Sequence, residues 1–235
     1  MKKSIVFVLM FFFTFVSSQK ISFESDLQIY YEIIFKPDST NSRLITNTVA
    51  LYEGKNKSIF QDSNRYKIDS MIQQQKMDFI PKLPMFSVNH IIYKDLDLFE
   101  ITYSENVATV NLGYKESIKS LNWQLLNGKK TILNLQCYEA KINLHGRNYT
   151  AWYTKDIPIS DGPYKFSGLP GLILEVYDSE NNFHYNAIAV TKKKMNIVYD
   201  QSIKYVERIK LRDAKIDNIV KNSKNEIKLN PMELK

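Results

Sequence analysis

Apolar and polar residues alternate along most of this chain, and a period of two predicts β-strands. The clearest case is residues 27–36, where every second side chain from Leu27 to Phe35 is apolar, so that one face is wholly apolar. Clusters of turn-forming residues such as Pro37-Asp38-Ser39 separate this segment from the next. Further strands are expected at 43–53, 58–61, 90–93, 98–103, 107–112, 123–126, 132–135, 138–144, 149–154, 172–177 and 183–189.

Two parts of the chain depart from this alternation. Residues 63–80 carry apolar side chains at three- and four-residue spacing behind a capping Ser63, which predicts a helix that ends near Pro81. Residues 207–220 are weakly helical in pattern, and the polar residues 221–235 have the composition of a frayed tail.

The connections between the expected strands are too short for parallel crossovers. The dipeptide Asn127-Gly128 favours a type I′ turn, so we expect a hairpin between the strands at 123–126 and 132–135. We therefore predict a mainly β fold: a single strongly twisted antiparallel sheet of about eight to eleven strands, curled into an open half-barrel, with one helix packed against it.

Backbone conformation is most constrained in residues 162–171, which hold three of the seven glycines and two of the seven prolines. Glycine tolerates positive φ and close approach of another backbone, whereas proline fixes φ and donates no hydrogen bond. An apolar run follows that is short enough to be a buried strand, which favours a structural role over a ligand-contacting loop. The predicted ligand-binding or structural hub comprises Trp152, Tyr153, Pro158, Gly162, Pro163, Phe166, Gly168, Leu169, Pro170 and Gly171.

The hexapeptide Gly168-Leu-Pro-Gly-Leu-Ile173 resembles the signature of the GLPGLI family, a group of secreted bacterial proteins without an assigned biochemical activity. Ala151-Trp-Tyr-Thr154, Ile157-Pro158 and Gly162-Pro163 resemble its flanks, and the likeness spans residues 30–178. Upstream residues at the spacing associated with the family are Trp123, Ile132, Cys137 and Ala140. The resemblance implies membership and export, and it assigns no catalytic residue.

Residues 1–18 have the pattern of a secretory signal peptide. Lys2 and Lys3 precede an apolar run from Ile5 to Val16, which is too short to span a bilayer. No cysteine lies near the cleavage position, so we expect a protein exported to the periplasm or the extracellular space that is not a lipoprotein. The expected organisation is a signal peptide at 1–18, a β-rich domain at 19–200 and a C-terminal extension at 201–235 that is partly helical or disordered.

Composition narrows the classes of partner and cofactor. The net charge of +7 falls to +5 once the signal peptide is removed, a modest excess, and export argues against a nucleic-acid partner. Cys137 is the single cysteine and cannot form an internal disulfide, so we expect a monomer stabilised by its core. We predict no cofactor.

Residues that carry chemistry are sparse. His90, His145 and His184 show no metal-type spacing, so we assign no metal ligand. Cys137 and His145, eight residues apart on one strand, would lie about 26 Å apart and cannot form a nucleophile–base pair. We assign no catalytic residue, although Asp156, Asp161, Glu175 and Asp178 cluster in sequence around the hub.

Three functions stay open at this point. Aromatic residues make 13% of the chain and are typical of pockets for apolar ligands, which favours a non-enzymatic envelope protein that binds an apolar ligand, a lipid or an extended peptide on a concave sheet face. The second is a hydrolase that uses the hub carboxylates. The third is a structural partner of an outer-membrane receptor, docking by an exposed sheet edge.

Overall fold

The computed structural model describes residues 20–65, 88–200, 202–222 and 228–234. The expected signal peptide at 1–18 and nearly all of the helix expected at 63–80 lie outside the described residues. Among these residues the fold is mainly β, with one large, mostly antiparallel sheet that is not closed into a barrel and one α-helix, as predicted.

The described sheet has twelve strands, one more than the upper limit expected. They are β1 (Lys20–Phe35), β2 (Ile45–Gly54), β3 (Lys57–Asp62), β4 (Ile91–Asp95), β5 (Glu100–Val107), β6 (Val110–Ser117), β7 (Gln124–Ile132), β8 (Leu135–Leu144), β9 (Arg147–Thr154), β10 (Leu172–Asp178), β11 (Phe183–Asp200) and β12 (Lys204–Tyr205). Their order in the sheet is β12-β6-β5-β4-β3-β2-β1-β11-β10-β9-β8-β7. Two meanders are thus joined edge to edge, and a short 3₁₀ turn at Ile118–Ser120 leads from one to the other.

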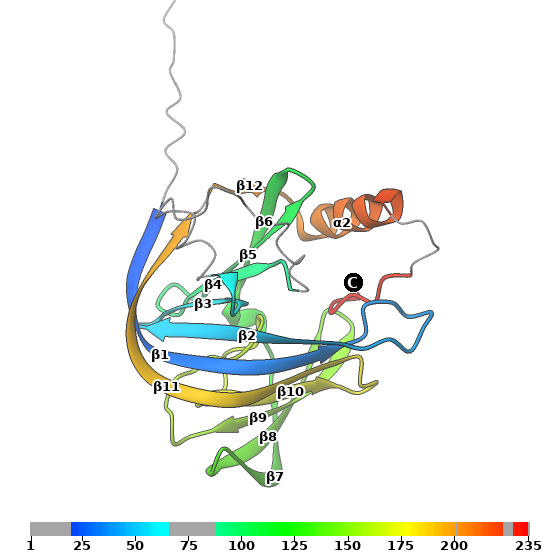
Figure 1. Cartoon of the computed structure of the whole chain (residues 1–235). Helices are drawn as coiled ribbons and strands as arrows, with labels where there is room; N and C mark the ends of the chain where they lie inside the picture. The colour runs from blue at the N-terminus through cyan, green and yellow to red at the C-terminus, as the bar shows by residue number, and fades with distance from the viewer. Residues whose placement is uncertain (1–19, 66–87, 201, 223–227, 235) are drawn as a thin grey trace, which may run out of the picture.

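The long antiparallel pair β1 and β11 joins the two meanders, and Figure 1 shows both as curved ribbons side by side. Ile29 and Tyr31 in β1 are completely buried, as their place on the wholly apolar face requires. Register shifts at Ser25/Leu27 and Tyr30/Tyr31 interrupt the pairing of β1 with β11, and such irregularities increase local twist and bend the strand.

The main core lies on the face of the sheet that carries Ile29, Tyr31 and Leu51, and it includes the hub side chains Phe166 and Leu169. A smaller cluster buries the opposite face where β1, β2, β3, β4 and β11 meet. Its members are Phe23, Ala50, Tyr52, Ile59, Tyr93, Ile197 and Tyr199. At the middle of the sheet, side chains on both faces are therefore buried.

The prediction of a hairpin turn at Asn127-Gly128 is wrong. Strand β7 runs straight through this dipeptide, and the chain turns instead at Leu133 and Asn134, whose φ angles of 50° and 62° suit a two-residue type I′ turn. The dipeptide lies in a pairing irregularity between Leu125 and Lys129. A side chain at Gly128 would overlap the side chain of Glu139 on β8, so a larger residue there requires Glu139 to move.

The helix packed against the sheet is α2 (Arg208–Asn222), which lies beside β5 and β6 (Figure 1). This is the weakly helical stretch that the sequence shows at 207–220. No helix among the described residues is long and apolar enough to cross a membrane. Residues 228–234, within the stretch whose composition suggests a frayed tail, make defined contacts with the sheet, and we call them the C-terminal segment.

Candidate functional site

The hub loop between β9 and β10 packs onto the main core face of the sheet. Tyr164, Phe166 and Leu169 are 4%, 0% and 2% exposed. Trp123 donates a hydrogen bond from Nε1 to the Ser167 carbonyl at 2.7 Å. The apolar side chains of the loop are therefore part of the main core.

A buried ion pair fixes the start of this loop. Lys94 on β4 contacts Asp161 at 2.5 Å and donates a hydrogen bond to the Gly162 carbonyl at 2.6 Å. Ser58 on β3 donates to the second oxygen of Asp161 at 2.5 Å. All three side chains are 0% exposed, and burial lowers the pKa of Lys94 while Asp161 opposes that shift. The hub is thus joined to the sheet by a pair of compensated charges.

Glu53 on β2 gives the fold a specific pH dependence. Burial, and next the nearby charges of Asp161 and Asp26, raise its pKa to about 7. Between about pH 4.5 and 7 the folded chain therefore holds a proton that the unfolded chain has released, so stability from this group falls as pH rises through that window. We expect Glu53→Gln to gain about 1–2 kcal/mol in free energy of unfolding at pH 8, a figure reduced for solvent screening, and almost nothing at pH 4. Urea unfolding at both pH values measures this, and an equal effect at the two would contradict it.

None of the ten predicted hub residues lines the cavity beside α2 that is described below, although their neighbour Tyr164 does. Trp152 and Tyr153 point to opposite faces of β9, as consecutive residues of a strand must. Exposed members are Pro158, Gly168 and Pro170, and the buried ones are Tyr153, Gly162, Pro163, Phe166, Leu169 and Gly171. Whether any of them contacts a ligand stays a prediction.

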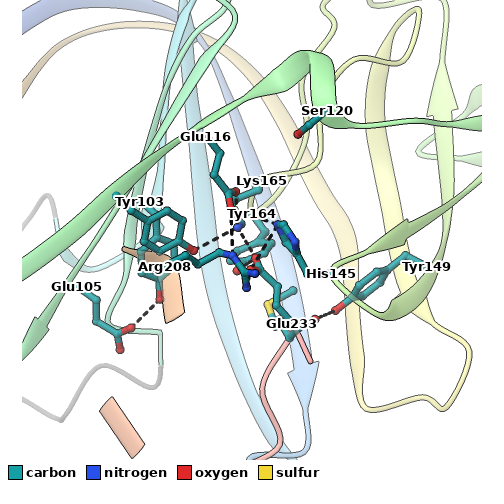
Figure 2. A network of polar contacts seen from close by, with 12 residues as sticks. Tyr103, Glu105, Glu116, Ser120, His145, Tyr149, Tyr164, Lys165, Arg208 and Glu233 are labelled. Atoms are coloured by element: carbon teal, nitrogen blue, oxygen red, sulfur yellow. Dashed lines mark hydrogen bonds and ion pairs between the residues drawn. The ribbon is translucent and has the colours of Figure 1, made fainter. Parts of the chain in front are cut away.

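A second buried polar cluster joins the hub to the C-terminal segment (Figure 2). The ammonium group of Lys165, 0% exposed, contacts Glu116 at 2.6 Å and also pairs with Glu233. Tyr164 donates a hydrogen bond to Glu233 at 2.6 Å. The Glu233 side chain is therefore held by two groups of the hub.

Arg208 and His145 complete this cluster. Arg208, the first residue of α2, lies 3.3 Å from Glu233 and 3.5 Å from Glu116. His145, in the turn between β8 and β9, lies 3.2 Å from Glu116 and 3.8 Å from Glu233. We call the groups that surround Glu233 the carboxylate socket: Glu116, His145, Tyr164, Lys165 and Arg208.

The electrostatics of the socket favour a charged Glu233. Burial alone raises the pKa of Glu233, but Lys165, then Tyr164 and His145, outweigh it and hold the pKa below its ordinary value. The pKa of Tyr164 is raised well above its ordinary value by burial and by Glu233, so its hydroxyl remains a donor.

Glu116, His145 and Glu233 place one ligand atom each within 4.8 Å of one another, which is a donor set that could hold a divalent metal ion. The ammonium group of Lys165 already contacts both carboxylates. The carboxylates of Glu116 and Glu233 are neutralised by Lys165 and Arg208. This arrangement fits an internal ion-pair network better than a metal site.

A cavity of about 530 Å³ lies between the sheet, α2 and the C-terminal segment, and we call it the α2 cavity. Most of its lining is apolar or aromatic, including Ile33, Phe35, Val107, Phe183, Tyr185, Leu211, Ile216, Ile219 and Met232. Its volume falls within the range of small-molecule sites in proteins. Strands β1, β5, β6 and β11 supply the sheet side of this space, and α2 lies across it.

The polar groups at the α2 cavity are largely paired already. Glu105 accepts a hydrogen bond from Tyr103 at 2.6 Å and pairs with Lys215 at 2.9 Å. His90 stacks on Tyr103 with ring centroids 5.4 Å apart, and burial lowers the pKa of His90 to about 3, so this ring is neutral at neutral pH. Paired charges and a neutral imidazole give the cavity an apolar character.

A third group of side chains lies on the opposite face of β7–β11. Lys130 pairs with Glu175 and lies over the Trp152 ring at 4.4 Å, and His184 contacts the other oxygen of Glu175 at 2.9 Å. Cys137 is 0% exposed, and burial raises the pKa of its thiol, which is the opposite of what a nucleophile needs. This group therefore supports no cysteine chemistry.

The carboxylate socket was not predicted from the sequence. Glu116, Lys165, Arg208 and Glu233 come from β6, the hub, α2 and the C-terminal segment, and no local motif connects them. The one sequence signal was the concentration of glycine and proline in the hub, which marks the loop that positions Lys165.

Comparisons with known proteins found a family match over a short region of this chain and a similar fold in solved structures. The family described as "Protein of unknown function (Porph_ging)", which is of GLPGLI type, matches residues 139–175, from β8 to the first part of β10. No curated protein matches this chain. The family match therefore supports the expected resemblance only over this region and assigns no activity.

Solved structures of PNGF-II in two crystal forms, P21 and C2, have a similar fold. They match with TM-scores of 0.56 and 0.55 at 15% identity, covering 83% and 82% of this chain. This chain spans about a third of the length of PNGF-II, since the matches cover 34% and 33% of that protein. The chain is thus similar over 37 residues to a family of unknown function and similar in fold alone to part of PNGF-II.

Proposed function

We propose that this chain is an exported protein that binds an apolar, lipid-like ligand in the α2 cavity without catalysing a reaction on it. The observation that carries the proposal is the cavity itself, about 530 Å³ in volume and lined mainly by apolar and aromatic side chains. Sites for small ligands have this size and composition, with a few polar groups that orient the ligand.

Charge supports an apolar body for this ligand. Glu105 and Glu233, the two carboxylates that line the cavity, are each paired with a cation. An ionic ligand buried beside them would need its own compensating partner, because an unpaired buried charge is costly. A polar head group is better placed near α2, where the side chain of Arg212 is one-third exposed.

The hydrolase alternative lacks a carboxylate pair. Asp161 pairs with Lys94, Asp178 accepts a hydrogen bond from Arg147 at 2.7 Å, and Glu175 pairs with Lys130. The fourth residue, Asp156, is exposed at the end of β9. Each of the three buried carboxylates thus has its own cation, and the pattern favours structural ion pairs over an acid and base acting together.

Docking of a protein partner at the sheet edge is also less favoured. Strand β7 forms one edge, and its residues include Lys129, Lys130 and the irregularity at Asn127-Gly128. Lysines and bulges on an edge strand are typical protections against pairing with another strand.

The ligand proposal is tested with an apolar fluorescent probe, N-phenyl-1-naphthylamine, and a matched pair of substitutions on α2. Ile216 lines the cavity, whereas Val220 on the same helix is 54% exposed and does not. We expect saturable probe binding that Ile216→Trp weakens by about tenfold or more, because the larger side chain occupies the cavity, and that Val220→Trp leaves within about twofold. Absence of saturable binding, or equal loss in both variants, would contradict the proposal.

Native mass spectrometry identifies the natural ligand. The protein is purified from its own cells without detergent, and a retained mass in the range of a lipid supports the proposal. A retained mass that Ile216→Trp abolishes and Val220→Trp preserves places the ligand in the α2 cavity.

A further inference from the structure

The C-terminal segment lies on the sheet as an extended peptide would lie in a binding groove. It is not a strand of the sheet, since its one β-bridge joins Leu229 to Asp38. Its other contacts are hydrogen bonds and ion pairs made by groups from the loop after β1, the turn between β8 and β9, β9, β11, the hub and α2. We call this surface the segment groove.

Backbone groups of the segment are recognised one after another. Arg147 donates to the Pro231 carbonyl at 3.0 Å, and Tyr149 donates to the Met232 carbonyl at 2.8 Å. The Leu234 amide donates to the His145 carbonyl at 2.9 Å. Main-chain contacts of this kind supply affinity in peptide recognition, and side-chain sites supply selectivity.

Asn230 is recognised on both sides of its amide. Its oxygen accepts from Arg147 at 2.8 Å, and its nitrogen donates to the Lys36 carbonyl at 3.0 Å. Its own backbone amide donates to the Pro37 carbonyl at 3.0 Å. Pro231 follows and needs no hydrogen-bond acceptor, because proline has no amide proton.

The carboxylate socket requires an acidic side chain from whatever occupies the groove (Figure 2). Without Glu233, the buried Lys165 and the partly buried Arg208 would face Glu116 alone, and the socket would carry an excess positive charge. An unpaired buried cation is strongly unfavourable, so the socket is built for an anion. Together with the Asn230 contacts this specifies the pattern Asn-Pro-x-Glu, in which x is apolar like Met232.

We infer that the segment groove is a binding site for an extended peptide of a partner protein that places a glutamate in the carboxylate socket, and that this chain's own C-terminal segment is its resident ligand. Exchange breaks one β-bridge, the backbone hydrogen bond from Leu234 to His145 and side-chain contacts, and it leaves the sheet ladders intact. The inference goes beyond the apolar ligand of the α2 cavity and does not depend on it.

The test uses the full-length chain and a fluorescein-labelled peptide of residues 228–234. Wild-type protein is expected to bind it weakly, because the tethered segment competes at an effective concentration of about millimolar. The double variant N230A/E233Q weakens the resident segment and keeps the groove intact. Fluorescence anisotropy is expected to show that this variant binds the peptide at least about tenfold more tightly than wild type does.

A matched peptide isolates the socket. The peptide with glutamine in place of Glu233 is expected to bind N230A/E233Q at least about tenfold more weakly than the parent peptide. Adding Tyr149→Phe to that variant removes one donor to the peptide backbone, and affinity is expected to fall several-fold with little change in thermal unfolding. If N230A/E233Q does not fold, N230A alone loosens the segment and leaves the socket's charges paired.

Three results would overturn the inference. The first is that the labelled peptide does not bind N230A/E233Q, and the second is that the parent and glutamine peptides bind it equally well. The third is that N230A/E233Q exchanges segments with a second copy of the chain. Size-exclusion chromatography with light scattering detects such a dimer, which would make the occupant another copy of this chain. N-phenyl-1-naphthylamine binding is measured on the wild-type chain and on Ile216→Trp and Val220→Trp, which keep the segment unchanged, so failure here is distinguishable from failure of the α2 cavity proposal.

Discussion

Asp161→Ala is expected to lower the free energy of unfolding by about 3–5 kcal/mol, because it leaves the ammonium group of Lys94 buried without its counter-ion. Lys94 and Asp161 are both 0% exposed, so water cannot replace the lost carboxylate. The substitution also removes the acceptor of Ser58 on β3. Urea unfolding followed by the fluorescence of Trp123 and Trp152 measures the change.

Two comparisons show whether charge is the cause. Replacing both partners, as in Lys94→Met with Asp161→Leu, is expected to recover part of the loss, since two apolar groups need no compensation. Lys194→Met breaks the pair between Lys194 and Glu24, whose side chains are 75% and 51% exposed, and is expected to leave unfolding unchanged. An Asp161→Ala protein as stable as Lys194→Met would show that the buried pair contributes little.

The sheet was predictable because strand signals are local. Alternation with a period of two appears within each segment, and burial of one face enforces it, as in the run from Leu27 to Phe35. Antiparallel neighbours follow from the short connections. The extension of β11 to Asp200 was not predicted, because Lys192 to Lys194 are charged, and their strand is held by pairing with β1 rather than by an apolar pattern.

The misplaced hairpin shows how tertiary contacts override turn propensity. Asn-Gly is a strong local signal, but the register of β7 against β8 places Gly128 where a side chain would meet Glu139. The actual turn contains Leu133, a residue that gives no signal for positive φ. From the sequence alone, a glycine in a turn could not be distinguished from Gly128, which lies within a strand next to the Glu139 side chain.

The candidate sites were predicted only in part. A concave, aromatic-lined surface was expected and a cavity exists there, yet its walls include α2 and the C-terminal segment, for which the sequence favours weak order. Glu233 acquires its partners through contacts with Lys165, 68 positions earlier, and with Arg208. Such pairings depend on which faces the sheet brings together, and a single sequence does not encode them in any local pattern.

The second large loss of stability is expected at the hub glycines. Gly171 and Gly168 require glycine for two different reasons, close backbone contact and backbone strain. At Gly171, φ is +150° and an added side chain would overlap the Thr154 carbonyl at the end of β9. Neither backbone can move without breaking the pairing of Leu172 with Thr154. We expect Gly171→Ala to cost more than about 4 kcal/mol or to prevent folding, seen as loss of near-ultraviolet circular dichroism.

Gly168 is the matched control, because it lies three residues earlier and also has a positive φ, of +89°. The nearest atoms to an added side chain there belong to Ile118 and Trp123, 3.9 Å away, so only backbone strain opposes the substitution. We expect Gly168→Ala to cost about 1–2 kcal/mol in urea unfolding and to keep the native spectrum. If both alanine variants unfold at the same urea concentration, close approach of β9 and β10 is not what requires glycine at Gly171. If Gly171→Ala alone fails to fold, the close contact with the Thr154 carbonyl is what requires glycine at this position.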